Sequence, residues 1–202
     1  MSREKHLEAP LSSAIASEIA DLQSQLHDMH TAHRFAELYL QQPVVVSNNP
    51  HGDIRQALWT ASLISYRRIF VNGVGHGKKQ HRLPLGTEWV ESLPPDLHEA
   101  HEEIYERASH HIAHRINREM QQIRVYAVLA EPPEPREVVE VETRTLNLVR
   151  PNPTMVRQLM AICDHLIGVA RERRDLLRSN ETERLNSEGN LDRLYRNAKP
   201  ED

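Results

Sequence analysis

The chain has 202 residues, of which 39% are hydrophobic and 27% charged, a balance typical of a globular protein with a packed core. Only 4% of the residues are aromatic, so we expect a core built mainly from aliphatic side chains. A net charge of −4 argues against a protein that coats nucleic acid through bulk charge, although it is compatible with a local basic patch.

The sequence has no apolar stretch approaching the roughly 18 residues that a bilayer-spanning helix needs, and its N-terminus lacks the apolar segment of a signal peptide. We therefore expect a soluble, cytoplasmic protein with no membrane partner. Cys163 is the only cysteine, which excludes an intramolecular disulfide or a thiolate metal cage within one chain. It falls in an apolar helical run, which predicts a buried core thiol rather than a nucleophile.

The first predicted helix runs from Leu11 to Gln42, because apolar residues recur at the three- and four-residue spacing of one buried stripe. Ser12 or Ser13 is its expected N-cap. Three histidines on this helix are spaced three residues apart, at His27, His30 and His33. This spacing allows an approach to a metal, but a solvated polar face is the better interpretation because no carboxylate or cysteine completes the set.

A second helix is predicted from Ile54 to Val71, with Asp53 as its N-cap. Adjacent arginines near its end, Arg67 and Arg68, complement the helix dipole.

The glycine-containing loop that follows, residues 71 to 86, lacks the GxxxxGK[ST] pattern of a phosphate-cradling loop. It carries the densest basic cluster of the chain, which comprises Lys78, Lys79, His81 and Arg82. Such a loop can bind phosphate, and an ordinary solvated loop is the alternative.

The third predicted helix, about Pro95 to Glu119, carries five of the thirteen histidines. Its expected inward stripe comprises Leu97, His101, Ile104, Ala108, Ile112 and Ile116. Arg107, His111 and His114 share another face, because they stand at i, i+4 and i+7. His110 and His114 also match the spacing of a two-histidine metal site, but no HExxH pattern is present and zinc would need a third protein ligand. A metal site is therefore a minor alternative, and we expect no cofactor.

Alternating segments at 123–130 and 137–149 predict a two-stranded β-ribbon, and Asn152 with Pro153 marks the start of a last long helix. The chain is thus predicted to be mainly α, a helical bundle of four to five helices with a small two-stranded β-ribbon insertion. Its expected organisation is an N-terminal helix packed on the bundle (1–46), a helical domain (47–178) with the ribbon at about 123–149, and a polar C-terminal tail (179–202).

An arginine and a histidine on one helical face can act on RNA without a metal. Histidine transfers protons near neutral pH, and arginine binds a phosphate and stabilises the charge that grows on it. Together they could help a 2′-hydroxyl attack the neighbouring phosphodiester. The alternative is that both side chains simply belong to a solvated helical face.

The segment YRRIF at 66–70, the basic loop up to Arg82 and Leu83, His98, and the helix from Arg107 to the Ile-Ala-His ending at His114 resemble the HEPN superfamily of small helical proteins. The resemblance covers about residues 50 to 175. That family carries an R-x4-6-H motif late in the domain, and six residues separate Arg107 from His114. The position after the arginine is usually polar in active members of the family, whereas here it is Ala108.

The resemblance implies an RNA-directed protein, and in its catalytic form a metal-independent endoribonuclease that serves as a toxin or defence component. Arg107 and His114 would be the catalytic pair, and His110, His111, Tyr66 and Arg68 would support them. Arg67, Lys78, Lys79 and Arg82 would bind RNA. The resemblance also implies a homodimer with a shared cleft, and a toxin would have a neutralising protein partner. Two alternatives stay open: a non-catalytic helical dimer that binds nucleotide, nucleic acid or a protein partner, and a histidine-metal protein.

Overall fold

The computed structural model describes residues 7–44, 50–74, 81–82, 84–113, 121–131, 136–147, 151–187 and 189–200. The elements in chain order are β1 (Leu7–Glu8), α1 (Ala14–Gln41), α2 (Pro50–Ile69), β2 (Gly73–Val74), β3 (His81–Arg82), α3 (Thr87–Glu91), α4 (Pro95–Ala113), β4 (Gln121–Leu129), β5 (Val138–Asn147), α5 (Pro153–Leu185), α6 (Leu191–Asn197) and β6 (Lys199–Pro200).

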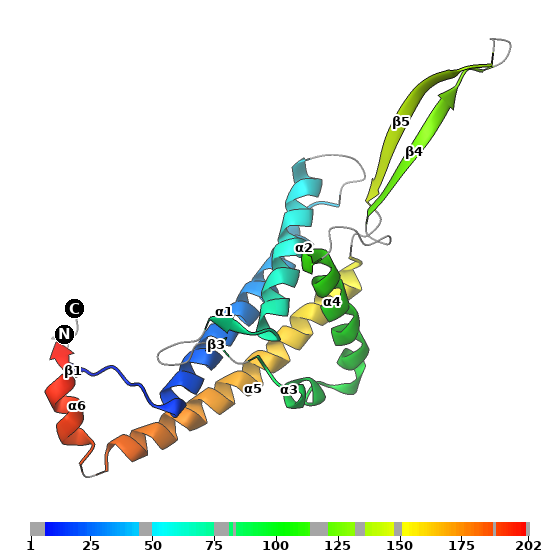
Figure 1. Cartoon of the computed structure of the whole chain (residues 1–202). Coiled ribbons are helices and arrows are strands. Elements are labelled where there is room, and N and C mark those ends of the chain that lie inside the picture. Colours follow the sequence, from blue (N-terminus) through cyan, green and yellow to red (C-terminus); the bar gives the residue numbers. More distant parts are fainter. Residues whose placement is uncertain are drawn as a thin grey trace.

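Four long helices form the body of the molecule (Figure 1). Helix α1 packs against both α2 and α5, and α4 closes the bundle by packing on α2 and α5. The predicted mainly α fold, a helical bundle with a small β-ribbon, is confirmed. Within the described ranges, no helix has the length and hydropathy needed to cross a lipid bilayer.

The two longest helices, α1 and α5, begin at the predicted capping residues. The Ser13 hydroxyl accepts a hydrogen bond from the Ala16 amide at 3.0 Å and so begins α1. The Asn152 side chain does the same for the Met155 amide at 2.7 Å, with Pro153 in the first turn of α5. These side chains satisfy amides that would otherwise lack a partner inside the helix, so both helices begin within three residues of their predicted starts.

The predicted start of the second helix was wrong. Helix α2 begins at Pro50, four residues before the expected Ile54, and Asp53 therefore lies in its first turn rather than at its N-cap. A proline is tolerated in a first helical turn because its missing N–H needs no partner there, and an acidic residue in that turn complements the dipole.

The segment expected to be a loop, residues 71 to 86, contains a short β2–β3 ladder in which Gly73 pairs with Arg82, and the five-residue helix α3 follows it. Helix α3 was not predicted, because five residues are too few for a periodic pattern. Trp89 and Val90 of α3 are half-buried against the core.

Helix α4 begins at Pro95, as predicted, and is described to Ala113; residues 114–120 lie outside the described ranges. The predicted inward stripe is confirmed at Leu97, His101, Ile104 and Ala108, which are all buried.

The core is aliphatic for the most part, with Leu63, Ile104, Leu159, Ile162 and Leu166 among its fully buried residues. Cys163 is buried among them, as expected. Three large aromatic side chains are also buried: Tyr39 of α1, and Trp59 and Tyr66 of α2. They lie where α2 packs against α1 or α4. Burial of these side chains from four helices joins the bundle into one core.

Strands β4 and β5 pair antiparallel from Gln121 opposite Asn147 to Leu129 opposite Val138, with a register irregularity between Val128 and Leu129. This ribbon projects from one end of the bundle, so its packing is largely between its own two strands (Figure 1).

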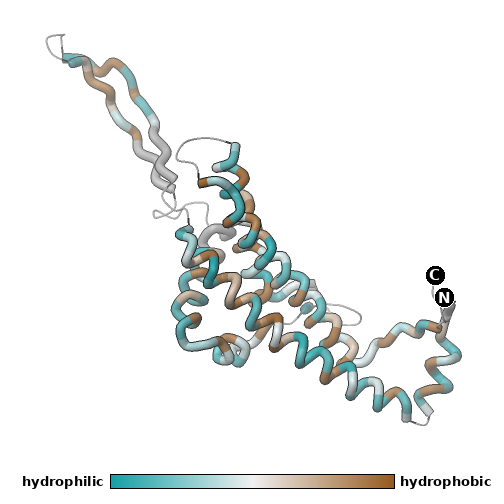
Figure 2. Tube along the Cα trace, turned by 180° about the vertical axis from the view of Figure 1, so that it is seen from behind, coloured by the Kyte–Doolittle hydropathy of each residue, from teal (hydrophilic) through white to brown (hydrophobic). Residues whose placement is uncertain are grey.

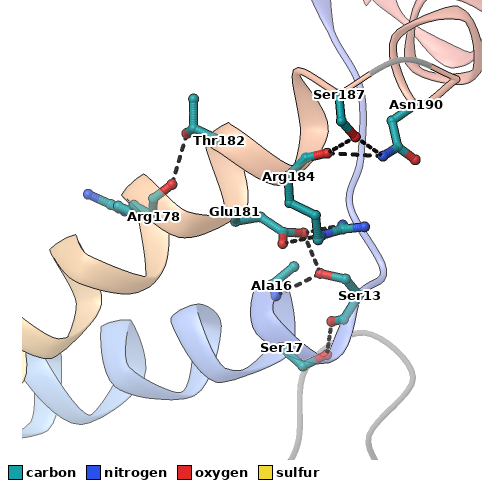
Figure 3. Close-up of polar contacts among 9 residues, drawn as sticks. All are labelled: Ser13, Ala16, Ser17, Arg178, Glu181, Thr182, Arg184, Ser187 and Asn190. Atoms are coloured by element: carbon teal, nitrogen blue, oxygen red, sulfur yellow. Dashed lines mark hydrogen bonds and ion pairs between the residues drawn. The ribbon is translucent and has the colours of Figure 1, made fainter.

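The opposite end of the molecule holds both ends of the described chain. Helix α5 runs past the expected start of the polar tail at 179 and ends at Leu185, and α6 follows it. Strands β1 and β6 then pair, with Leu7 opposite Pro200. Glu181 of α5 accepts hydrogen bonds from Ser13 and Arg184, which ties the end of α5 to the start of α1 (Figure 3).

Candidate functional site

Arg107 lies on the solvent side of α4, one residue before the fully buried Ala108. Its side chain is 27% exposed. Nε and Nη2 of its guanidinium both donate to Oε1 of Glu103, at 3.1 and 2.7 Å. Since Glu103 stands one turn earlier, the helix itself supplies this carboxylate. The arginine that the sequence singles out is therefore held in an ion pair that solvent can reach.

The histidines expected to work with Arg107 are described only in part. His110 and His111 belong to the last turn of α4, but their side chains lie outside the described part of the structure, as does the whole of His114. Lys78 and Lys79 also lie outside it. The relative positions of Arg107 and His114 thus stay a prediction from the sequence.

The surface of α4 around Arg107 is acidic. Four exposed glutamates of this helix precede the arginine by one to eight residues, at Glu99, Glu102, Glu103 and Glu106. A phosphate that approaches the described part of this face would meet more negative than positive charge, which disfavours binding of RNA there.

The neighbouring aromatic cluster joins α2 to α4. Tyr66 and His101 are buried, and the Tyr66 hydroxyl lies 2.5 Å from Nδ1 of His101. The ring of Phe70 packs edge-on against the rings of Tyr66, His101 and Tyr105, and the ring of Tyr105 stacks on that of His101. Burial raises the pKa of Tyr66 well above its usual value and lowers the pKa of His101. Tyr66, expected to support a catalytic pair, thus makes its polar contact inside the core.

The two adjacent arginines of α2 point to different helices. Arg67 donates from Nε to the Ser109 hydroxyl of α4 at 3.3 Å. Arg68 instead lies 3.4 Å from the Asp28 carboxylate of α1, and its side chain is 59% exposed. Residues one apart on a helix are rotated by roughly 100°, so the pair cannot form one continuous binding surface.

Arg82, the last member of the expected basic cluster, is buried with only 4% of its side chain exposed. Nη1 donates to Asp28 at 2.8 Å and to the Ser24 hydroxyl at 2.9 Å, and Nη2 donates to the Arg68 carbonyl. Gly73, its ladder partner, leaves room for the guanidinium, since a Cβ there would stand 3.1 Å from Nε of Arg82. A buried guanidinium in such a pair positions the β2–β3 ladder on α1 and cannot reach a phosphate in solvent.

Asp28 was not singled out from the sequence. A signal was present, because Asp21, Gln25 and Asp28 are polar residues at i, i+4 and i+7 on the same side of α1, and all three are buried. A polar stripe with helical spacing inside an apolar one indicates that another segment supplies partners for it.

Two histidines of α1, His30 and His33, contact α5. His33 lies 3.4 Å from the Asp164 carboxylate, and His30 lies 3.1 Å from the Arg171 guanidinium. Burial and the Arg171 charge lower the pKa of His30. Among the described residues, no group of three or more His, Cys, Asp or Glu side chains is placed to hold a metal ion.

Among the described residues, the β4–β5 ribbon carries the largest set of exposed apolar side chains. Val125 is 66% exposed, Leu129 67%, Val138 57%, Val139 62% and Val141 66%. Figure 2 shows hydrophobic segments on both strands of this ribbon, well away from the bundle. Sequence reasoning located the ribbon but did not select it as a functional site.

These features define an elongated helical-bundle protein with a projecting β-ribbon. Comparison of the chain with models of protein families, with curated proteins and with solved structures finds no match in any of the three.

Proposed function

We propose that this chain is a non-catalytic helical protein whose β4–β5 ribbon binds a protein surface. The exposed apolar ribbon is the observation that carries the proposal. An isolated two-stranded ribbon is marginally stable in water, so it gains from packing on another surface. Contiguous exposed apolar side chains on a folded protein commonly mark such an interaction site, whereas single ones do not.

The charge of the ribbon favours protein over nucleic acid as the bound partner. Residues 121–147 contain five glutamates and three arginines. Nucleic-acid binding draws its affinity from lysine and arginine contacts to phosphates, and a net negative ribbon opposes that contact.

The polar contacts inside the bundle support the non-catalytic part of the proposal. Tyr66, Arg82 and Asp28 are all buried, and their hydrogen bonds go to neighbouring helices or to the β2–β3 ladder. Side chains occupied in this way hold the fold together and offer a substrate no reactive group.

Site-specific photo-crosslinking tests the binding role. The chain is produced in cells with Val141→p-benzoylphenylalanine, and in parallel with Glu172→p-benzoylphenylalanine as the control, because Glu172 is an exposed residue of α5 far from the ribbon in sequence. We expect protein adducts from position 141 and none from position 172. Equal adduct formation at both positions, or adducts to nucleic acid alone, would remove the proposal.

RNA cleavage is the second candidate, and the surface position of Arg107 is what favours it. The guanidinium is partly exposed, and its bond to Glu103 would orient it while leaving Nη1 open to a phosphate. His114 would then supply the proton transfer that the HEPN-like motif implies. Arg67, Lys78 and Lys79 would steer RNA in this candidate, and Arg82 would not.

Cleavage of a mixed RNA pool between pH 5.5 and 8.5, with and without chelator, decides this candidate. A catalytic pair predicts chelator-resistant cleavage that Arg107→Ala and His114→Ala each abolish, and that Arg157→Ala, at an exposed arginine of α5, leaves intact. RNA that stays uncut by the wild-type protein throughout this range contradicts it.

A further inference from the structure

We infer that the surface covering the β4–β5 ribbon is the same ribbon of a second copy of this chain, packed face to face and antiparallel about a two-fold axis. The inference rests on the proposed function and adds the identity of the partner and the geometry of the contact.

The strand register makes the ribbon two-sided. Val125 stands opposite Thr143, Ala127 opposite Val141, and Leu129 opposite Val138. Side chains alternate between the faces of a strand, so Val125, Ala127, Leu129, Val141 and Thr143 share one face, and the register irregularity brings Val138 to that face opposite Leu129. The other face carries Tyr126 opposite Glu142 and Val128 opposite Glu140. The ribbon therefore has one face of Val, Ala, Leu and Thr, and one face that contains the charged residues.

The amount of apolar surface suits a contact between two copies. Val125, Leu129, Val138 and Val141 are each more than half exposed. Packing this face against an identical one would bury on the order of 1,000 Å² in total, near the lower limit of specific interfaces. A two-fold contact uses the same patch on both chains, so no second apolar patch is needed elsewhere on the molecule.

The ribbon also offers a central point of close approach. Ala127 is the small residue between Val125 and Leu129 on the apolar face. With the two-fold axis near Ala127, each Val125 lies over the Leu129 of the second copy, and the two Ala127 residues face each other at the centre of the contact. Because the ribbon projects away from the bundle, the two bundles then lie at opposite ends of the joined ribbons and do not collide (Figure 1).

The distribution of charge selects the antiparallel arrangement. The tip of the ribbon is rich in glutamate, with Glu131, Glu137 and Glu140. A parallel arrangement would bring the two acidic tips together, whereas the antiparallel one keeps them at opposite ends of the joined ribbons.

The molar mass of the full chain, measured by light scattering from roughly 1 to roughly 100 μM, tests the inference in the range where an interface of this size associates. We expect the mass to double with concentration, and Val125→Lys to shift the midpoint at least tenfold upward. Val128→Lys is the matched control, because it places the same charge on the opposite face, across from Glu140. A chain that stays monomeric, or a dimer equally stable in both variants, overturns the inference.

Thiol cross-linking tests the geometry. Because faces of packed sheets lie about 10 Å apart, which is too far for a direct disulfide, Ala127→Cys is expected to join two copies through a short bis-maleimide, whereas Val128→Cys is not. Glu131→Cys is also expected to stay uncrosslinked, because two tips related by an axis at Ala127 stand about 26 Å apart. Trapping through position 131 indicates parallel ribbons and overturns the antiparallel arrangement. The buried Cys163 does not interfere.

The two proposals fail in different ways. A monomeric chain whose position 141 still crosslinks to another protein loses the second-copy inference and keeps the binding role of the ribbon. A chain that forms no protein adduct from position 141 loses both.

Discussion

The hydroxyl oxygen of Tyr66 lies 2.5 Å from Nδ1 of His101, and this hydrogen bond joins α2 to α4 inside the core. Because burial raises the pKa of Tyr66 well above its usual value, the phenol keeps its proton and donates it. Because burial lowers the pKa of His101, the imidazole is neutral at pH 7 and Nδ1 accepts. The contact therefore fixes the tautomer of His101 with its proton on Nε2.

Tyr66→Phe is expected to lower the free energy of unfolding by about 1 to 3 kcal/mol, since it leaves Nδ1 of His101 buried without its donor. Urea denaturation followed by circular dichroism measures the change. Tyr105→Phe is the matched control, because Tyr105 packs in the same ring cluster but is only partly buried. Equal stability of Tyr66→Phe and the wild type would show that the hydrogen bond contributes nothing.

The lowered pKa of His101 predicts weaker stability in mild acid. The unfolded chain takes up a proton near pH 6.5, whereas folded His101 resists protonation until a lower pH. Its contribution is therefore complete above about pH 6.5 and is lost as the pH falls toward the lowered pKa. We expect the melting temperature to fall between pH 7.5 and 5.5, and to fall less in His101→Gln than in His27→Gln, an exposed control. His30 acts in the same direction, so the slope is reduced but not abolished.

Because Arg82 and Asp28 form a buried pair, we expect each single substitution to lower the free energy of unfolding more than the double substitution does. Asp28→Asn leaves the buried Arg82 without its carboxylate partner, and Arg82→Met leaves Asp28 only the more distant, exposed Arg68, at a cost of about 3 to 5 kcal/mol. The double variant should recover much of that loss, which a double-mutant cycle in urea measures as a coupling energy. The exposed pair of Arg34 and Glu37 is the comparison, where each single change should cost less than about 1 kcal/mol. Additive losses at Arg82 and Asp28 would contradict a direct interaction.

We expect the end of α5 to detach from α1 in acid, because Glu181 joins the two helices through its carboxylate. Hydrogen bonds from Arg184 and Ser13 lower its pKa from 4.5 to about 2. The folded pKa lies below the unfolded one, so this stabilisation is present above about pH 4.5 and is lost as the pH falls toward 2. Hydrogen exchange of the last turns of α5 should therefore be faster at pH 3 than its intrinsic pH dependence accounts for. Glu181→Gln should loosen the same turns at pH 6, whereas Glu172→Gln, at an exposed position of α5, should not.

We expect the labelling rate of the Cys163 thiol to report opening of the core. It is fully buried, and burial raises its pKa far above its usual range. We expect Ellman's reagent to label the native protein far more slowly than it labels Ser179→Cys, an exposed position on the same helix. The rate at Cys163 should rise with urea in parallel with unfolding. Rapid labelling without denaturant would mean that the α5 core opens readily in the native state.

Much of the fold could be predicted from the sequence because its signals are local. The caps at Ser13 and Asn152, the stripe from Leu97 to Ala108 and the alternation of the ribbon each depend on residues a few positions apart. The pairing of Arg82 with Asp28 spans 54 positions, so only the tertiary structure reveals it. The same limit explains why the basic cluster near Arg82 was expected to face solvent.

The same difference between local signals and long-range contacts applies to the candidate site. Spacing alone places Arg107 and His111 on one helical face, but it does not specify that Glu103 holds the guanidinium. Alternation alone predicts the β4–β5 ribbon, but whether a ribbon folds back on its bundle or stands clear depends on packing between distant segments. The exposed face of Val125 and Val141 therefore became visible only in the structure.

The pairing of β1 with β6 has a practical consequence for anchoring the molecule. These strands bring residues 7 and 200 side by side, at the end of the bundle remote from the ribbon (Figure 1). A biotin or an affinity handle attached next to either strand would hold the molecule at the same place on a sensor chip. The ribbon would then stand upright toward the flowing solution, roughly 50 Å or more from the surface along α5.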